Sequence, residues 1–186
     1  MAAEDQRMEF LVVNRDPAIE APGFFEEKHA QQLERAQRCR EIFDQYGLPS
    51  PDRVGAEAAS DFWVLVQHAD GDVELQLDVL AAIESDASGG YDPSESAYLV
   101  DRVRVNTGRP QVYGTQMDFD NRTARAFPKP IEAPAKVDER RADAGLESLV
   151  SYVNGVCESH FHMNEASYRE KGVTKAYVYA EGFLDW

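Results

Sequence analysis

Apolar residues recur every three or four positions over several long stretches of this chain, a spacing typical of helices that bury one face. The clearest stretch is 26–46, where charged and amide side chains fill the positions between the apolar ones. Gly47 and the prolines after it should end this helix, because glycine suits a C-terminal cap and proline cannot continue a helix. Similar patterns predict a second helix at 55–68 and a third from about 73 to a glycine-containing break at 88–90.

A fourth helix is predicted at 93–106. Asp92 can cap its first turn, and Pro93 suits the first helical position, where a missing N–H costs nothing. Further on, 137–144 and 146–157 form a helix or a helix pair interrupted at Gly145. Short links between the helices before 106 favour antiparallel neighbours.

Strand patterns are fewer and shorter. The segments 111–117 and 123–127 are expected to pair as a small hairpin about a polar turn. The tail at 174–180 alternates polar and apolar residues, as a half-buried strand does, and continues to the apolar Phe183, Leu184 and Trp186. The apolar run 10–13 is either a short strand or the last turn of a helix that begins near Asp5.

The fold class that follows is mainly α: an antiparallel helical domain of about five helices with a small β-hairpin and a candidate C-terminal strand. With 186 residues the chain can close one core without disulfides or metals. We expect a single helical domain at 1–154 and a C-terminal extension at 155–186.

Charge narrows the classes of partner. The 34 acidic residues outnumber the 19 basic ones, for a formal net charge of -15. Such a surface repels phosphate, so we expect neither nucleic acid nor an anionic membrane as partner, whereas a basic protein or peptide remains open. Cys39 and Cys157 form no disulfide framework, the first residues are acidic rather than basic, and no apolar run approaches a membrane span. A cytoplasmic location is therefore expected.

Four blocks of sequence, in a fixed order, resemble a bacterial domain family of unknown function. They read G-L-P-S-P-D-R-V-G, V-Q-H-A-D, Y-L-V-D-R-V-R-V-N-T-G-R-P-Q-V-Y-G-T-Q and V-D-E-R-R-A-D-A-G-L. The resemblance covers about 31–152. It implies a small, mainly helical domain and no particular reaction.

Candidate chemistry centres on Asp101 and Arg102 in the fourth predicted helix. Helical spacing puts Asp101 on the same face as Ala97, Tyr98 and Val105, and a carboxylate among apolar residues needs a partner. One interpretation is a structural ion pair or network that clamps this helix to 111–116. The other makes Asp101 a general base and Arg102 an anchor for a carboxylate or phosphate.

The segment 111–116 is polar on both faces of a hypothetical strand, which an ordinary half-buried strand avoids. It is either a loop whose amides satisfy neighbouring helix ends or the wall of a pocket. In the second case Tyr113 would be an acid or hydrogen-bond donor, and Gln111, Thr115 and Gln116 would orient a polar substrate.

His68 lies at the expected end of a helix, where it either interacts with the helix dipole or acts as a base. The antiparallel order would bring this end beside the end of the fourth helix, so that His68, Asp101 and Tyr113 could converge. Arg141, in a charged cluster near a helix start, could pair inward with Asp101 or bind substrate.

The sequence contains only weak patterns for a metal site and none for a common cofactor site. Cys157, His160 and His162 resemble half of a metal site, and Asp70 and Asp72 are more simply turn residues. The sequence has no P-loop, no dinucleotide-binding glycine pattern and no nucleophile elbow. We therefore expect no cofactor and no metal, although a metal-dependent hydrolase is a third alternative.

The resulting hypothesis is a small enzyme, or an enzyme-like domain, that acts by acid–base chemistry on a polar small molecule or peptide. Its predicted catalytic residues are His68, Asp101 and Tyr113, and its predicted substrate-binding residues are Arg102, Gln111, Thr115, Gln116 and Arg141. The alternative is a non-catalytic domain that binds a basic protein or peptide, so that enzymatic activity itself is left open.

Overall fold

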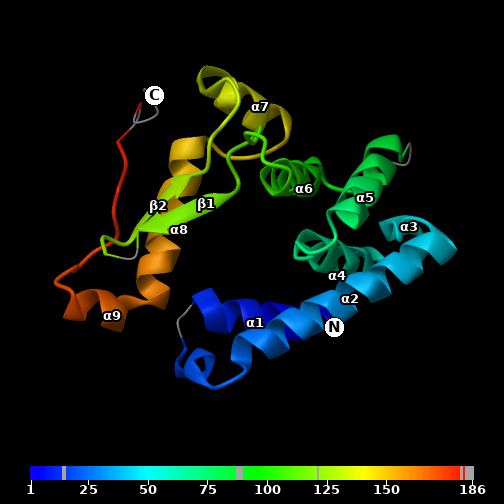
Figure 1. The fold of residues 1–186 in the computed structure, drawn as a ribbon. Helices are drawn as coiled ribbons and strands as arrows, with labels where there is room; N and C mark the ends of the chain where they lie inside the picture. Colours follow the sequence, from blue (N-terminus) through cyan, green and yellow to red (C-terminus); the bar gives the residue numbers. More distant parts are fainter. Residues whose placement is uncertain (14–15, 87–89, 121, 181, 183–186) are drawn as a thin grey trace.

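The computed structural model describes residues 1–13, 16–86, 90–120, 122–180 and 182. Within these ranges the chain is mainly helical with one two-stranded antiparallel sheet, as predicted (Figure 1). Its elements are α1 (Ala2–Val13), η1 (Pro17–Glu20), α2 (Phe24–Tyr46), α3 (Pro51–Val54), α4 (Ala56–Gln67), α5 (Val73–Ser85), α6 (Pro93–Asn106), β1 (Met117–Asp120), β2 (Arg125–Pro128), η2 (Pro134–Lys136), α7 (Val137–Asp143), α8 (Leu149–Met163) and α9 (Glu165–Glu170). None of the helices in this described part is long and apolar enough to cross a membrane.

The strongly periodic stretches form the helices that the sequence predicts. Helix α6 begins at Pro93, with the Asp92 carboxylate accepting a hydrogen bond from the Ser94 amide, so both start signals operate as expected. The run 10–13, predicted to be either a short strand or the last turn of a helix, is the last turn of α1. The described residues hold more helices than the five predicted, because α1, α3 and α9 carry too few periodic apolar positions to be recognised. The predicted break at 88–90 falls largely outside the described residues, as do Phe183, Leu184 and Trp186.

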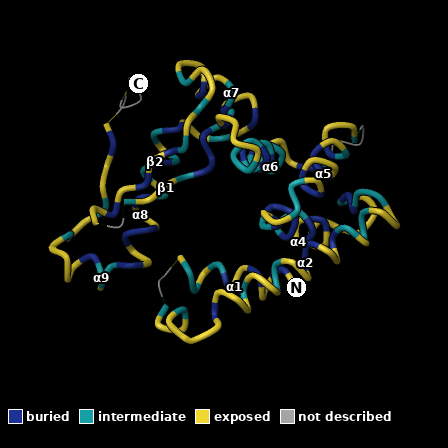
Figure 2. Tube along the Cα trace, viewed as in Figure 1, coloured by how far each residue is buried: buried dark blue, intermediate teal, exposed yellow. Residues whose placement is uncertain are grey.

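Helix α4 is the centre of the larger core. It contacts α1, α2, α5 and α6, and its apolar residues belong to one cluster of buried side chains from these helices. The buried positions of this part follow the inner faces of its helices (Figure 2). Packing against four helices fixes the direction of α4 and therefore the position of His68, which caps its C-terminal end.

The second half of the chain has its own smaller cores. One joins β2, α7 and α8, and another joins Ala124, Phe161 and Tyr168. The predicted boundary between 154 and 155 lies inside α8, and the division into a domain and an extension stays a prediction. The segment 174–180 is not a strand. Its Tyr179 amide and carbonyl pair instead with the side chain of Asn154, which takes the place of a neighbouring strand.

The hairpin is shorter than predicted and starts later. Strand β1 pairs with β2 from Met117 opposite Pro128 to Asp120 opposite Arg125. The segment 111–116, which we expected to open the first strand, is a loop apart from one isolated bridge between Gln111 and Ile131. Its path bends at Gly114, where φ is 75°.

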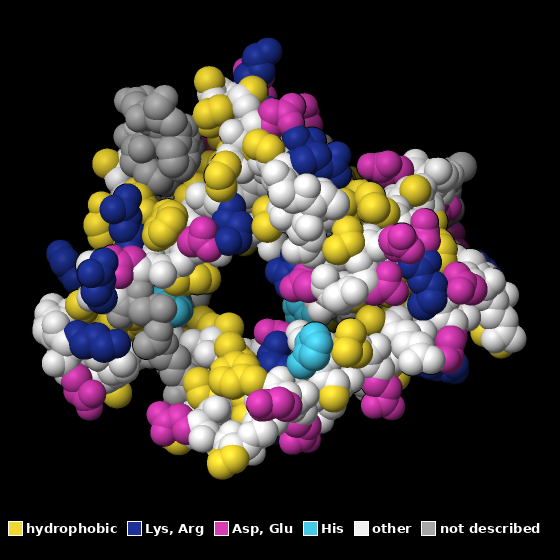
Figure 3. Space-filling model, in the orientation of Figure 1, with side chains coloured by type: hydrophobic (Ala, Val, Ile, Leu, Met, Phe, Trp, Pro, Cys, Tyr) yellow, Lys and Arg dark blue, Asp and Glu magenta, His cyan; other side chains and the backbone are white. Residues whose placement is uncertain are grey.

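The two halves are arranged around an opening, which the space-filling view shows (Figure 3). Figure 1 shows α1, α2, α4 and α6 on one side of it and the hairpin with α8 on the other. The halves meet again where the Asn164 side-chain amide donates to the Val13 carbonyl oxygen at 3.0 Å. Loop 111–116, which follows α6, is the covalent connection between the halves.

Gly114 should tolerate no side chain. A Cβ there would lie 2.8 Å from Leu149 Cδ1 and 2.9 Å from Ile131 Cδ1, in addition to the strain of its positive φ. We expect Gly114→Ala to lower the free energy of unfolding by about 2–4 kcal/mol, measured by urea denaturation. Gly108→Ala is the matched control, because Gly108 has φ 71° and open space around it. Its expected cost is about 1 kcal/mol, and equal losses in the two variants would contradict the close packing at Gly114.

Candidate functional site

The loop 111–116 folds around the carboxylate of Asp101. This side chain has no exposed surface and accepts hydrogen bonds from the backbone amides of Val112 (2.6 Å), Tyr113 (3.0 Å) and Thr115 (2.8 Å). The Thr115 hydroxyl donates to it at 3.0 Å. A buried carboxylate is stable only when its oxygens are satisfied in this way. Asp101 is therefore the anchor that bends the loop onto α6.

The carbonyl groups of the same loop are held from the opposite side. Arg140 Nε donates to the Val112 oxygen at 2.8 Å, and Arg141 Nη1 donates to the Tyr113 oxygen at 2.7 Å. The Tyr152 hydroxyl donates to the Thr115 oxygen at 3.1 Å. The peptide group between Val112 and Tyr113 thus lies between the Asp101 carboxylate, which accepts from its N–H, and the Arg140 guanidinium, which donates to its oxygen, so that each charge strengthens the other contact.

Three predicted site residues, Asp101, Gln111 and Arg141, use their polar groups to hold this loop in place. Arg141 is buried, with its guanidinium 4.8 Å from the centre of the Tyr152 ring. Gln111 is buried too, and its amide bonds both the carbonyl and the N–H of Gln116. Asp101, Gln111 and Arg141 are positioning residues in this geometry, which lends no support to the chemical roles predicted for them.

The Tyr113 side chain lies at a cavity on another side of the loop from Asp101. It lines this cavity of about 380 Å³ together with Tyr91, which precedes α6, and with residues of α5, α6 and α7 such as Glu84 and Arg140. Burial and the nearby Asp101 carboxylate raise the pKa of the Tyr113 phenol. Neither His68 nor Arg102 is among the described residues that line this cavity. Tyr113 and His68, which the helix order allowed to converge, do not share this cavity, because the loop fixed by Asp101 directs the phenol toward α5 and α7.

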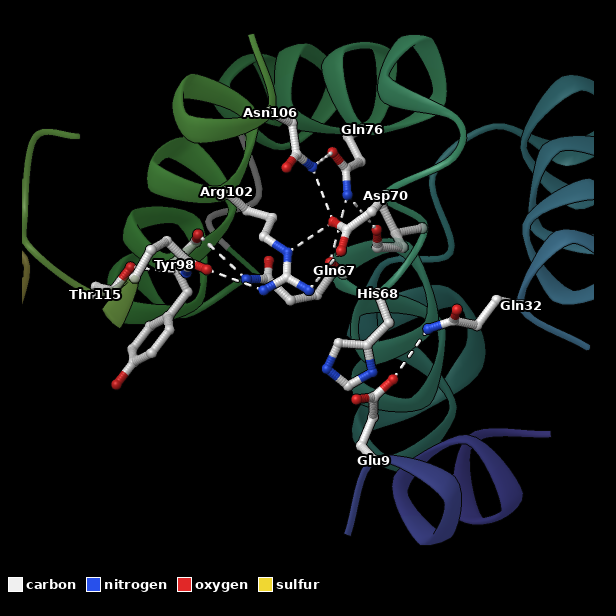
Figure 4. Close-up of polar contacts among 12 residues, drawn as sticks. Glu9, Gln32, Gln67, His68, Asp70, Gln76, Tyr98, Arg102, Asn106 and Thr115 are labelled. Atoms are coloured by element: carbon white, nitrogen blue, oxygen red, sulfur yellow. Dashed lines mark hydrogen bonds and ion pairs between the residues drawn. The ribbon is translucent and has the colours of Figure 1, made fainter. Parts of the chain in front are cut away.

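Arg102 faces another way than Asp101, as adjacent residues of a helix must. Its Nε and Nη2 donate to the two oxygens of Asp70 at 2.8 and 2.9 Å, a bidentate ion pair (Figure 4). Its Nη1 donates to Gln116 Oε1 at 2.9 Å, and the Gln116 amide group donates to the Thr115 hydroxyl oxygen. The loop held by Asp101 thus orients Arg102 through Gln116.

Asp70 continues this network toward α5. It also accepts from Asn106 Nδ2 at 2.8 Å, and the same amide donates to Gln76 Oε1 at 3.0 Å. Gln76 is fully buried and donates to the carbonyl of Val66 near the end of α4. The expected proximity of the ends of α4 and α6 is confirmed by these contacts.

His68 has an acidic partner that the sequence analysis did not identify. Its Nδ1 lies 2.5 Å from Asp5 Oδ2, and the other Asp5 oxygen accepts from Arg35 Nη1 at 3.0 Å. Burial acts to raise the pKa of Asp5, but the hydrogen bond and charge of His68, with the charge of Arg35, lower it overall. A carboxylate can only accept, so Nδ1 is the donor, and in the neutral ring Nε2 carries the free lone pair.

His68 caps α4 and Arg102 lies in α6, two helices on the same side of the central opening (Figure 1). Figure 3 shows this opening through the face of the molecule, with acidic, basic and histidine side chains at its edge. In Figure 4 His68 lies between Arg102 and Glu9, and the ring of Tyr98 lies beyond Arg102. The side chains of His68 and Arg102 are 25% and 26% exposed, so both have surface that a ligand can contact.

The partners that sequence reasoning missed come mainly from α1. Asp5 and Glu9 are four residues apart, a spacing that puts them on one face of a helix, but the pattern of 2–13 did not decide between helix and strand. Gln67, beside His68 in sequence, donates through its side-chain amide to the Tyr98 carbonyl oxygen. The side-chain oxygen of Gln67, Oε1, is buried with no hydrogen-bond partner in the described part of the chain.

The cysteine and histidines near the end of α8 do not gather. His160 is buried with its Nε2 2.8 Å from the Tyr168 hydroxyl, whereas His162 is 62% exposed. Across the described ranges no three His, Cys, Asp or Glu side chains are grouped as metal ligands would be.

Asp101 should be essential for stability. Asparagine in its place would turn an N–H group toward the loop amides, leaving buried donors without an acceptor. We expect Asp101→Asn to lower the free energy of unfolding by about 3–5 kcal/mol, measured by chemical denaturation. Asp118→Asn is the control, because the Asp118 side chain is 50% exposed and pairs only with Lys129 among the described residues. Its expected cost is below about 1 kcal/mol, and a similarly small loss for Asp101→Asn would contradict the anchoring role.

Asp5 should contribute stability that acid removes. Because its folded pKa is lowered, its contribution is present above the unfolded pKa of about 3.9 and is lost as pH falls through the folded value. The difference in unfolding free energy between the wild type and Asp5→Asn should therefore shrink between about pH 5 and pH 2. Thermal or urea unfolding over that range measures it, and a difference that stays constant or grows in acid would show that the Asp5 carboxylate is not stabilised by its partners.

A sequence model of a family of unknown function (DUF6624) matches residues 16–163. The match includes His68, Arg102 and the whole loop 111–116, and it begins after α1, which supplies Asp5. No curated protein and no solved structure matches the chain. The resemblance to an uncharacterised domain family is confirmed: the chain belongs to this family of unknown function.

Proposed function

We propose that this protein is a small enzyme, or an enzyme-like domain, that acts by acid–base chemistry on a polar small molecule or peptide, with His68 as the proton acceptor. The observation that carries the proposal is the contact of His68 Nδ1 with the buried Asp5 carboxylate, at the C-terminal end of α4. Helix α4 is one of the helices beside the opening that the space-filling view shows (Figure 3). A histidine held in this way by a carboxylate is oriented for proton transfer at its other nitrogen.

In this mechanism Nε2 of neutral His68 takes a proton from the substrate or from a water molecule beside it. The ring then carries a positive charge, which the Asp5 carboxylate at 2.5 Å stabilises. The hydrogen bond and charge of Arg35 help to keep that carboxylate ionised and fixed, so the histidine loses little freedom at the moment of transfer. The same proton can return to the product in a later step.

Arg102 is the proposed substrate anchor. Its guanidinium is held by Asp70 and by Gln116, and the Gln116 side chain is itself bonded to Thr115. An arginine fixed in this manner can direct its remaining N–H groups at a carboxylate or a polarised carbonyl. Asp101 acts indirectly, as the anchor of the loop, and Tyr113 lies outside this proposed site.

The reaction is proposed for the cytoplasm. Cys39 and Cys157 are both buried and unpaired, which suits a reducing compartment. The net charge of -15 argues against nucleic acid as substrate or partner.

The alternative is a non-catalytic domain that binds a basic protein or peptide. Its support is the excess of acidic residues, several of which are exposed, such as Glu34 and Glu41 beside α1. Binding that weakens steeply with salt, with no conversion of the bound molecule, would favour this alternative.

His68→Asn should abolish conversion of substrate. The purified protein would be incubated with a pool of small metabolites and short peptides, and depletion would be followed by mass spectrometry. We expect depletion by the wild type to fall by about 10²–10⁴-fold in His68→Asn, the usual loss when a general base is removed. The melting temperature should fall by only a few degrees, since His68 is part-exposed.

His162→Asn is the matched control, because His162 is 62% exposed and has no contact with Asp5, Arg35 or Arg102 in the described part of the chain. It should deplete the pool as the wild type does. Depletion that survives in His68→Asn, or no depletion by the wild type of any compound in the pool, would contradict the catalytic proposal.

A further inference from the structure

Two charged side chains on either side of His68 have hydrogen-bonding capacity that the protein does not use. Figure 4 shows Glu9 on one side of the imidazole and Arg102 on the other. They come from different helices, α1 and α6, and carry opposite charges. Their unused atoms define what kind of molecule would fit between them.

Glu9 is held by one oxygen only. Its Oε1 accepts from Lys28 Nζ at 2.6 Å and from Gln32 Nε2 at 3.0 Å. Within the described ranges no group donates to Oε2, and the side chain is 30% exposed. Two donors on one oxygen fix the carboxylate plane, so the second oxygen is presented in a defined direction. A positively charged donor such as an ammonium group is the natural partner for it.

Arg102 is also held on part of its guanidinium only. The group has five N–H donors, and three of them bind Asp70 and Gln116. The remaining two have no acceptor in the part of the chain that the structure describes. Because the three contacts fix the plane of the guanidinium, these two N–H groups are already oriented for a carboxylate.

We propose that the site binds a zwitterion: a molecule with a free amine that pairs with Glu9 and a free carboxylate that pairs with Arg102, as in amino acids and short unblocked peptides. This inference rests on the proposed function and specifies its substrate. His68, drawn between the two charges in Figure 4, then faces the middle of the bound molecule, where the bond or proton that reacts would lie.

The charges of the surroundings favour a zwitterion over a simple ion. A ligand with only negative charge would meet Glu9 and the half-exposed Asp70, and a ligand with only positive charge would meet Arg102. Only a molecule with both charges pairs with each of its neighbours and leaves no like charges together.

The test uses glycine, diglycine and triglycine as probes, since the series varies the spacing between amine and carboxylate. Each is compared with its N-acetyl derivative, which lacks the positive charge, and with its C-terminal amide, which lacks the negative one. Binding to the full chain is measured by isothermal calorimetry, without reference to turnover. We expect at least one zwitterion to bind about tenfold or more tightly than both of its capped forms.

Two variants test which protein side chain binds the amine of the ligand and which binds its carboxylate. Glu9→Gln should remove the preference for the free amine over the acetyl form, and Arg102→Gln should remove the preference for the free carboxylate over the amide. Glu158→Gln and Arg122→Gln are matched controls, since the side chains of Glu158 and Arg122 are 69% and 90% exposed. Both control variants should keep the wild-type preferences.

Capped and uncapped probes of equal affinity would overturn the proposal, and so would preferences that survive in Glu9→Gln and Arg102→Gln. Failure of all three zwitterions to bind at millimolar concentration would also overturn it. These outcomes are separate from the fate of the catalytic proposal. Depletion of another compound that depends on His68 would leave acid–base catalysis standing with a different substrate, whereas zwitterion binding without any depletion would leave a binding site only.

Discussion

The buried carboxylate of Asp101 is the constraint on which the rest of the site depends. An ionised carboxylate without exposed surface is costly unless each oxygen is well supplied with donors. Here the donors are three backbone amides and one hydroxyl from the loop that follows α6. The loop cannot take another path without leaving that charge unsatisfied, so its irregular course is as well defined as that of a helix. Arg140, Arg141 and Tyr152 complete the arrangement by donating hydrogen bonds to the carbonyl oxygens of Val112, Tyr113 and Thr115 in the same loop.

This constraint reaches the opening through a short series of contacts. Thr115 bonds Asp101 and Gln116, Gln116 bonds Arg102, and Arg102 bonds Asp70 at the end of α4. The two helices that carry Arg102 and His68 are thereby fixed relative to each other. Asp5 plays a comparable part for His68, joining α1 to α4 through a second buried carboxylate. In both places a buried carboxylate fixes the surrounding backbone or helices. A part-exposed basic side chain nearby, Arg102 in one case and His68 in the other, stays accessible to a ligand.

The sequence predicted what depends on local pattern and missed what depends on tertiary contacts. Helices α2, α4, α5 and α6 follow from periodicity and caps, and the unusual polarity of 111–116 correctly marked a segment with many directed hydrogen bonds. The prediction of a strand there is wrong because alternation cannot reveal that the amides of Val112, Tyr113 and Thr115 turn toward one side chain. The separation of Tyr113 from His68 has the same origin. The pairing of Asp5 with His68 spans 63 positions, and no local signal joins residues so far apart.

Amide hydrogen exchange at Val112, Tyr113 and Thr115 tests the central claim most directly. These amides bond a side-chain carboxylate rather than a backbone carbonyl, so a loop without that carboxylate contact would exchange as fast as an open segment. Our account predicts that all three exchange as slowly as the amides in the middle of α6. Exchange at the rate of an unprotected loop would show that Asp101 does not organise this part of the molecule.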